Sequence, residues 1–410
     1  MAVPPQPVAL PRQRVTVDLD VGAVAHGGVC VARHEGRVVF VRHALPGERV
    51  RARITEERSR YARADAVEVL AASPDRVVPP CPFAGPGRCG GCDWQHASLD
   101  AQRRLKAAVV REQLARLARL DWSGDVAEVP GAPGGLGWRT RVRFAVTPDG
   151  AVGFRRHRSH DVQPIDHCQI AHPLVEAAGV EGRRWPGAIA IEVAAGATSG
   201  ETAVVVEGAG ATDVAGDVAA VVHERAGGRR WRVSAGGFWQ VHPGAADTLL
   251  AAVLDLADPQ PAERALDLYA GVGLFAAGLA ERVGAAGRVI AVEGDRGAVT
   301  DARDNLADLP QVRVRRASVT ADVVRRLAPA DVVALDPPRT GAGADVVRAI
   351  GALGPRAVVY VACDPAALAR DLATFASAGY AMRELRAYDL FPMTAHVECV
   401  ALLQPVGPST

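Results

Sequence analysis

A thiol and a carboxylate close to the C-terminus have the chemical types and positions for covalent catalysis. Cys363 lies two residues after the apolar run 357–361 and precedes Asp364 and Pro365, so we expect it where a buried strand ends and a helix, 366–375, begins. Open α/β sheets place their reactive groups at such strand ends, where a thiolate can act as a nucleophile. Free cysteines also serve as small packing residues, and Cys363 taken alone leaves that alternative open.

Glu398 lies in a second strand-like run, 396–403, which follows residues 391–395. An ordinary interpretation makes it an acid on an exposed edge strand. Beside a reactive thiol, the same carboxylate can act as a general base.

A glycine turn at residues 266–275 indicates a ligand site. The apolar run ending at Tyr269 leads into Gly271 and Gly273 and then into a predicted helix, whose free N–H groups favour close approach of a ligand. Glu293 follows the next predicted strand, where an acid can accept the hydroxyls of a ribose. The turn also fits the loose dinucleotide fingerprint, so it predicts an adenosine-type ligand without separating a nicotinamide cofactor from S-adenosylmethionine.

The segment Asp336-Pro337-Pro338-Arg339 directly follows the buried run 332–335. Two prolines stiffen the loop and fix the corner from which Asp336 projects. Such a segment is common in methyltransferases that act on planar nitrogen or carbon centres and unusual in dehydrogenases. It therefore favours S-adenosylmethionine.

Four of the seven cysteines form a candidate metal site. Cys81, Cys89 and Cys92 are clustered in a stretch rich in proline and glycine, and Cys168 lies far along the chain. Iron–sulfur clusters and zinc both take four soft ligands, and the spacing does not choose between them. An odd cysteine count argues against a disulfide framework.

The elements that must position these residues change along the chain. After a proline-rich tail at residues 1–11, predicted to be disordered, residues 12–73 show five short alternating runs, which predict a small barrel. Its cations favour an RNA-facing surface over a mere folding appendage; they are Arg49, Arg51, Arg53, Arg58, Arg60 and Arg63.

Residues 74–232 are expected to form a central α+β domain. The cysteine loop is followed by a predicted helix, 100–120, and by a predicted hairpin that turns at residues 148–150. Arg139, Arg141 and Arg143 alternate along one hairpin strand, which suits phosphate contacts or a solvated face.

Residues 233–410 alternate short buried strands with helical segments, which predicts a doubly wound parallel sheet. The expected strands are 265–269, 289–292, 332–335 and 357–361.

Composition adds little to these motifs. The chain of 410 residues has 23% charged residues and a formal net charge of +1, which indicates no nucleic-acid partner by itself. All of its 47 basic residues except Lys106 are arginine, so arginine richness reflects coding bias as much as function. No apolar run is long enough to span a bilayer and the N-terminus lacks the form of a signal peptide, so a cytoplasmic protein is expected.

The ordered motifs resemble those of the RNA 5-methyluridine (uracil-C5) methyltransferases. They are Cys-x7-Cys-x2-Cys, the glycine turn, Asp-Pro-Pro-Arg, Cys-Asp-Pro and Phe-Pro-x-Thr-x-His-Val-Glu. The chain looks most like the branch with an N-terminal TRAM domain and a [4Fe-4S] cluster. The resemblance implies an OB-like TRAM barrel, a central domain with an iron–sulfur loop, and a C-terminal Rossmann-like class I methyltransferase domain.

The resemblance also implies roles for individual residues. Cys363 would be the nucleophile and Glu398 the general base. Contacts to S-adenosylmethionine are implied for Gln240, Tyr269, Glu293 and Asp336, beside the glycines 271 and 273, and the cluster ligands would be Cys81, Cys89, Cys92 and Cys168. Asp364 and Ala270 depart from the family's more usual Asn and Cys, and the first cysteine gap is longer, but every reacting group is present.

The implied activity is methylation of uridine C5 in RNA through a covalent bond between the cysteine and uracil C6, by a monomer. The cluster-bearing branch favours 23S rRNA as substrate, with tRNA as the alternative. Two other classes remain: a nicotinamide oxidoreductase that uses the same glycine turn, and a catalytically inactive RNA-binding or redox-sensing iron–sulfur protein. Intact Cys363 and Glu398 argue against the last of these.

Overall fold

The computed structural model describes residues 15–208, 211–214 and 221–407, and the chain divides after Val77 into two compact units. The predicted tail at residues 1–11 lies outside the described residues. None of the helices in these ranges is long and apolar enough to cross a bilayer.

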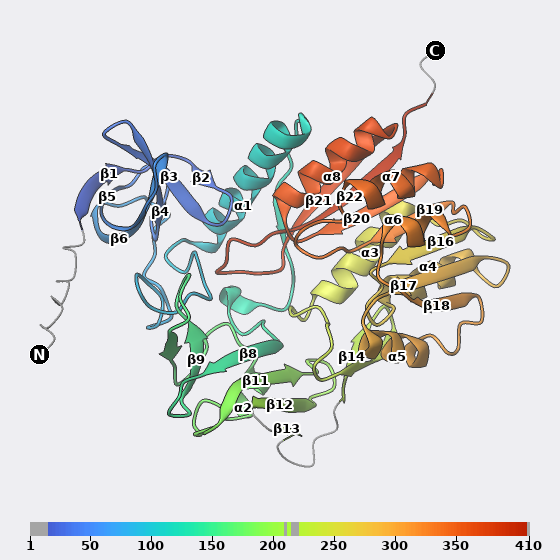
Figure 1. The fold of residues 1–410 in the computed structure, drawn as a ribbon, viewed down its shortest axis with the longest axis horizontal. Coiled ribbons are helices and arrows are strands. Elements are labelled where there is room, and N and C mark those ends of the chain that lie inside the picture. Colours follow the sequence, from blue (N-terminus) through green and yellow to red (C-terminus); the bar gives the residue numbers. More distant parts are fainter. Residues whose placement is uncertain (1–14, 209–210, 215–220, 408–410) are drawn as a thin grey trace, which may run out of the picture. The chain divides into compact units, whose positions relative to one another are not determined.

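The first unit is a curled sheet of six strands in the order β1-β5-β6-β4-β3-β2, one strand more than the sequence predicted (Figure 1). Val31 exchanges backbone hydrogen bonds with Gly22 and Ala23, which brings β3 back to the segment after β1 and nearly closes the barrel. The strands are β1 (Thr16–Asp20), β2 (Val24–Ala25), β3 (Val29–His34), β4 (Arg37–Arg42), β5 (Arg49–Glu57) and β6 (Tyr61–Ala71).

Half of the predicted RNA-facing cations of this barrel already have acidic partners. Arg51 pairs with Asp18 and Glu68, and both Arg58 and Arg63 pair with Glu56. Ion pairs therefore neutralise part of the expected basic surface. Of the six arginines, the three that form no ion pair within the described barrel are Arg49, Arg53 and Arg60.

An eight-stranded sheet organises the second unit, in the order β18-β17-β16-β19-β20-β22-β21-β7. The first five strands are parallel, which confirms the predicted doubly wound sheet. β22 is antiparallel to both of its neighbours, β20 and β21. The strands are β7 (Val126–Glu128), β16 (Arg264–Leu268), β17 (Arg288–Glu293), β18 (Val312–Arg316), β19 (Val332–Leu335), β20 (Ala357–Ala362), β21 (Tyr380–Asp389) and β22 (Glu398–Pro405).

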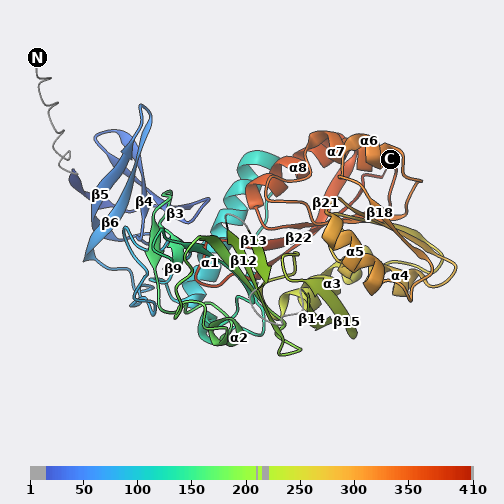
Figure 2. The ribbon, with the colours of Figure 1, turned by 60° about the horizontal axis from the view of Figure 1, so that its bottom comes forward.

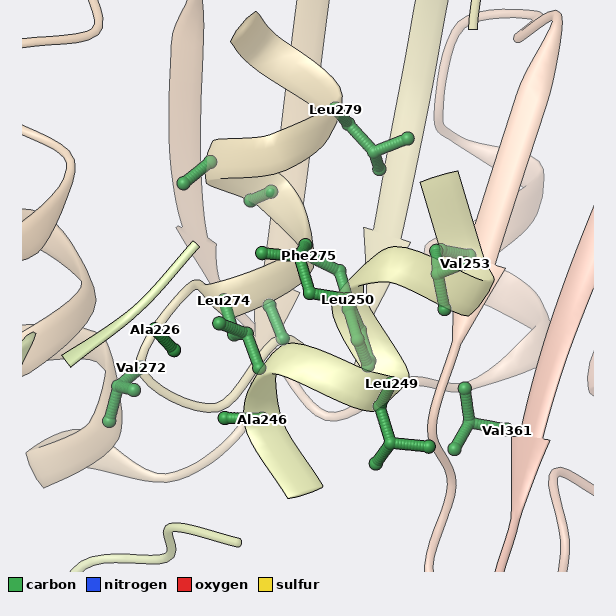
Figure 3. Close-up of a cluster of buried hydrophobic side chains, with 14 of the residues drawn as sticks. Ala226, Ala246, Leu249, Leu250, Val253, Val272, Leu274, Phe275, Leu279 and Val361 are labelled. Atoms are coloured by element: carbon green, nitrogen blue, oxygen red, sulfur yellow. The ribbon is translucent and has the colours of Figure 1, made fainter. Parts of the chain in front are cut away.

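Helices cover both faces of this sheet, so its strands are apolar on both sides (Figures 1 and 2). One face packs against α3 (Ala245–Ala257), α4 (Leu274–Val283) and α5 (Arg296–Asn305); Figure 3 shows Leu249, Phe275 and Val361 in this core. The other face packs against α1 (Leu99–Gln113), with its π-helical extension Leu114–Ala118, α6 (Ala321–Arg325), α7 (Ala344–Ala352) and α8 (Pro365–Ser377).

The remaining strands lie between α1 and α3 in sequence. A six-stranded sheet has the order β10-β9-β8-β11-β12-β13, and β14 and β15 form a separate hairpin. Their bounds are β8 (Arg141–Val146), β9 (Val152–Arg155), β10 (Val162–Pro164), β11 (Ala188–Ala195), β12 (Thr202–Gly208), β13 (Ala211–Val214), β14 (Val221–Ala226) and β15 (Arg229–Ser234), with a short helix α2 (Pro173–Ala177) and a 3₁₀ turn at Pro133–Gly135.

Two features of the central region differ from the sequence interpretation. The short strand β7 and the helix α1 pack into the large sheet although they precede residue 233, the predicted start of the C-terminal domain. Arg141 is not on a solvated or phosphate-facing surface: it is 7% exposed and donates to the carbonyl oxygens of Ala235 and Gly237 at 3.1 and 2.7 Å. Arg143 is exposed but pairs with Glu207.

Candidate active site

A cleft of about 730 Å³ opens at the carboxyl ends of the parallel strands in the large sheet. Every catalytic and cofactor residue predicted from the sequence lines it except Gly273. The predicted residues in the lining are Cys363, Glu398, Gln240, Tyr269, Gly271, Glu293 and Asp336. Gly273 instead precedes α4 with φ +96°, and a Cβ there would lie 2.7 Å from a Leu306 methyl group, so the glycine permits a turn and close packing.

Cys363 is held at the junction of a buried strand and a helix. All six residues of β20 are buried, and Asp364 caps α8 by accepting the N–H of Ala367 at 2.7 Å. Burial raises the pKa of Cys363 to about 12, and the carboxylates of Glu398 and Asp336 act in the same direction. The resting side chain is therefore a neutral thiol.

Glu398 stands opposite Cys363 because of the strand register. Ala362 and Cys399 form the last antiparallel pair of β20 and β22. Cys363 follows Ala362 and Glu398 precedes Cys399, so these two residues adjoin at the end of the sheet. Glu398 is 3% exposed, and burial followed by the nearby Asp336 raises its pKa well above the ordinary value. A carboxyl group of this kind suits a general base.

Asp336 and Arg339 come from the loop after β19. Burial raises the pKa of Asp336 to about 7, which permits a proton to be held there near neutral pH. Arg339 lines the same cleft, and its positive charge lowers the pKa of both Cys363 and Glu398 against the effect of burial. Arg339 belongs to the Asp-Pro-Pro-Arg motif, but no sequence pattern indicated a role for it.

The glycine turn is fixed by two buried or half-buried carboxylates. Glu293 accepts the N–H of Gly271 at 2.9 Å and that of Asp295 at 2.7 Å, so one side chain ties the ends of β16 and β17 together. Asp267, which no sequence pattern singled out, is fully buried and accepts the N–H of Ala276 at 2.8 Å. Tyr269 has φ +65°, a left-handed conformation at the end of β16.

The loop between β21 and β22 supplies a further part of the cleft wall. Phe391, Thr394 and His396 line the cleft just before Glu398. Burial lowers the pKa of His396 to about 4, so its ring is neutral near neutral pH. Phe391 and Trp138 form a T-shaped aromatic pair with ring centroids 6.0 Å apart. The motif at residues 391–398 contains all of these side chains, but Glu398 was the only one of them for which the sequence predicted a role.

The four predicted metal ligands come together from distant parts of the sequence. Cys81, Cys89, Cys92 and Cys168 line one small cavity of about 40 Å³. Hydrogen bonds reach the sulfur atoms, including one from the Gly91 N–H to Cys89 Sγ at 3.4 Å. Among the described residues, no group of three or more His, Cys, Asp or Glu side chains has the geometry to hold a metal ion.

The cysteine cavity and the cleft are neighbours. Gly91 and Arg139 line both. Cys92 and Cys168 pack against a small buried cluster that contains Trp138 and Met393. Because Met393 belongs to the loop before Glu398, this cluster connects the packing around the cysteines to that loop.

Two family models match the chain. The TRAM domain matches residues 12–67, and the family described as tRNA (Uracil-5-)-methyltransferase matches residues 221–406.

Curated relatives match over nearly their whole length. A Streptomyces avermitilis protein described as an uncharacterized RNA methyltransferase is 52% identical, covering 95% of this chain and 98% of the relative. An Alkalilimnicola ehrlichii protein named 23S rRNA (uracil(1939)-C(5))-methyltransferase RlmD is 34% identical, covering 96% of this chain and 97% of the relative.

A solved structure has the same fold. The tRNA (uracil-54, C5)-methyltransferase of Pyrococcus abyssi, in complex with S-adenosyl-L-homocysteine, gives a TM-score of 0.69 at 24% identity. The match covers 94% of this chain and 99% of that one.

Proposed function

This chain belongs to the family of RNA uracil-C5 methyltransferases, and from that premise we propose that it methylates C5 of a uridine in RNA with Cys363 as nucleophile and Glu398 as base. The observation that carries the assignment is the register of β20 and β22, which sets the thiol and the carboxylate side by side in the cleft.

The chemistry follows from the target. Uracil C5 is a poor nucleophile until the Cys363 thiol loses its proton to solvent and the thiolate adds to C6, which breaks the 5,6 double bond and leaves C5 as an enolate carbon. That carbon takes the methyl group from the sulfonium of S-adenosylmethionine, whose leaving product is S-adenosylhomocysteine. Glu398 then removes the remaining C5 proton, the double bond re-forms, and the thiolate leaves C6.

The target base must leave its stack so that both ring faces are accessible. Extrusion costs about a few kcal/mol. The cleft of about 730 Å³ has the volume for a cofactor and a base together. Phe391 in its wall offers aromatic surface for the extruded ring, and the buried Trp138 packs behind it.

Five lining residues are proposed to hold S-adenosylmethionine. Glu293 keeps acceptor capacity beyond its two backbone bonds and can accept the ribose hydroxyls. The other four are Gln240, Tyr269, Gly271 and Asp336. Gly273 contributes by allowing α4 to start close to this site.

We propose that Cys81, Cys89, Cys92 and Cys168 hold a [4Fe-4S] cluster rather than zinc. Zinc–thiolate bonds of about 2.3 Å draw four sulfurs close around one ion, whereas a four-iron cluster spreads its ligands around a larger body. The four thiols line one common cavity, which supports a group held by four thiolates, and the choice of the cluster over zinc rests on the resemblance of the ordered cysteine motif. When bound it would supply cross-links between distant segments, and it takes no part in the methyl-transfer steps above.

Elemental analysis of protein purified without oxygen tests the cluster. Iron and acid-labile sulfide in equal amounts, with a brown colour, are expected. Zinc without iron would refute the assignment.

The favoured substrate is 23S rRNA, because a relative named for that activity matches nearly the whole chain. The alternative is tRNA, for which the Pyrococcus abyssi enzyme is named. The TRAM barrel is proposed to bind RNA near the target, and the enzyme to work as a monomer in the cytoplasm. Mapping 5-methyluridine in both RNAs from a strain that lacks this protein decides between the substrates.

Methyl transfer itself is tested with S-adenosylmethionine labelled in the methyl group and with unmodified RNA from such a strain. Labelled 5-methyluridine is expected from the wild type and none from Cys363→Ala. Product formation by that variant at the wild-type rate would refute the thiol mechanism.

A further inference from the structure

A hollow of about 490 Å³ at the outer edge of the large sheet is lined by five arginines. Three of them come from the edge strand β18, one from α5, and one directly follows α6. The rest of the lining is apolar, with no carboxylate. We call this site the arginine hollow; its cations are Arg303, Arg313, Arg315, Arg316 and Arg326.

These arginines differ from others on the same unit. Arg325 pairs with Asp322 at 2.8 Å, Arg348 pairs with Asp345 at 2.6 Å, and both are three-residue pairs along a helix. In the part of the chain that the structure describes, no ion pair or side-chain hydrogen bond is recorded for any of the five arginines in the hollow. Like charges gathered in one hollow repel one another, so an anion that enters it is attracted by all five.

Protection of the sheet edge is the competing explanation. Charged residues on an edge strand prevent pairing with another chain, and Arg313, Arg315 and Arg316 lie on such a strand. That explanation does not account for Arg303 and Arg326, which belong to other elements and yet face the same space.

The hollow lies on the same sheet as the proposed active site, at its outer edge. Arg316 is in register with Glu293, which lines the cleft. Four strand spacings separate β18 from β20, which is about 19 Å across the sheet at 4.8 Å each. A nucleic-acid strand that delivers a base to Cys363 can reach that far within several nucleotides.

We propose that the arginine hollow binds backbone phosphates of the RNA substrate several nucleotides from the target uridine. Arginine forks bind phosphate oxygens in pairs, and the apolar floor keeps the guanidinium groups from being fully hydrated. The hollow would be an RNA-binding surface on the methyltransferase unit itself, separate from the TRAM barrel. This inference rests on the proposed RNA substrate.

The test is the double variant Arg313→Gln/Arg326→Gln, compared with Arg325→Gln/Arg348→Gln as a matched control. Both pairs are exposed arginines of the same unit, but the control pair already has carboxylate partners. The apparent KM for RNA should rise roughly tenfold in the first variant, and the slope of log affinity against log salt should become shallower by about 0.7–0.9 for each phosphate that the variant no longer neutralises. The kcat at saturating RNA and the affinity for S-adenosylmethionine should stay at wild-type values, as should all parameters of the control.

Unchanged RNA affinity and salt slope in the first variant would overturn the proposal, and aggregation of that variant without an RNA defect would assign the arginines to edge protection. An equal RNA defect in the control pair would also overturn it, because the effect would then be one of overall charge. Filter binding of RNA is measured separately from methyl transfer. A wild type that binds RNA but makes no 5-methyluridine would therefore contradict the proposed function and leave the hollow's role measurable.

Discussion

The main-chain N–H of Met393 donates to Oε1 of Gln102 at 2.7 Å, which ties the loop before Glu398 to helix α1. Met393 has φ +68°, a conformation that is unfavourable for a residue with a side chain. Its carbonyl accepts the N–H groups of Asp93 and Trp94, both at 3.0 Å. The segment after Cys92 and the helix thus hold one strained residue from two sides.

Replacing Gln102 with leucine should loosen this loop. The glutamine is fully buried and also donates to the carbonyl of Ala97 at 2.9 Å, so the change leaves buried groups without partners and should cost about 1–3 kcal/mol of stability. Because the loop positions the proposed base, proton removal at C5 should slow more than methyl transfer. Covalent RNA–protein adduct should then accumulate on denaturing gels.

Gln113→Leu is the control for that experiment. Gln113 is equally buried on the same helix but bonds to its neighbour Glu112. It should lose stability without adduct accumulation. The same adduct level in both variants would show that Gln102 only stabilises the fold.

Lys106→Met should destabilise the second unit strongly. Lys106 and Asp389 form an ion pair with side chains 0% and 2% exposed, and the ammonium also donates to the Phe391 carbonyl at 3.0 Å. Removing the cation leaves a buried carboxylate uncompensated, at a cost of about 3–5 kcal/mol. Denaturant unfolding measures this loss in the free energy of unfolding, and the additional change Asp389→Leu should recover part of it. No recovery would mean that the packing of the lysine stem dominates.

Glu398→Gln should separate the two halves of the reaction. The amide cannot take the C5 proton, so the methylated adduct should persist while turnover falls about 10²–10⁴-fold. Cys363→Ala should give no adduct at all. If the glutamine variant releases RNA that contains 5-methyluridine at the normal rate, another group is the base.

The rate of adduct formation should rise with pH. Burial and the neighbouring carboxylates raise the pKa of Cys363 to about 12, so the thiolate fraction grows about tenfold for each pH unit across the neutral range. Single-turnover measurements at saturating RNA and S-adenosylmethionine report this step. A rate that is flat between about pH 7 and 9 would mean that bound substrate has already deprotonated the thiol.

Acid should weaken the TRAM barrel through Glu48. Burial of this carboxyl raises its pKa, but bonds from Arg76, at 2.7 Å, and from the N–H groups of Leu45 and Ser73 outweigh that effect and leave the pKa below the ordinary value of 4.5. Its stabilising contribution is therefore complete above pH 4.5 and disappears as pH falls through the lowered pKa.

Glu48→Gln should accordingly reduce the acid sensitivity of the thermal unfolding of the first unit between about pH 6 and 3. Glu68→Gln is the control, because Glu68 is an exposed partner of Arg51. An acid dependence identical in Glu48→Gln and the wild type would assign the effect to other carboxylates.

The sequence alone determined the local features of the site. A run of apolar residues before Cys363, the Asp364 cap and the Pro365 start fix a strand, a turn and a helix within a few residues. The glycine turn and the expected strands at 265–269, 289–292, 332–335 and 357–361 followed from the same short-range patterns, and the structure confirms them within two residues.

Only the tertiary structure decided which of these residues meet. Glu398 adjoins Cys363 because β22 inserts antiparallel between β20 and β21, an outcome of long-range sheet pairing that leaves no local pattern. The alternation of Arg139, Arg141 and Arg143 predicted that all three lie on one exposed face of the hairpin. Instead, β11 and the loop at residues 235–237 bury Arg141, whose guanidinium donates to backbone carbonyl oxygens of that loop. The environment of a charged side chain can be predicted from sequence only when its partners are near in the chain, since its energy depends on what packs around it.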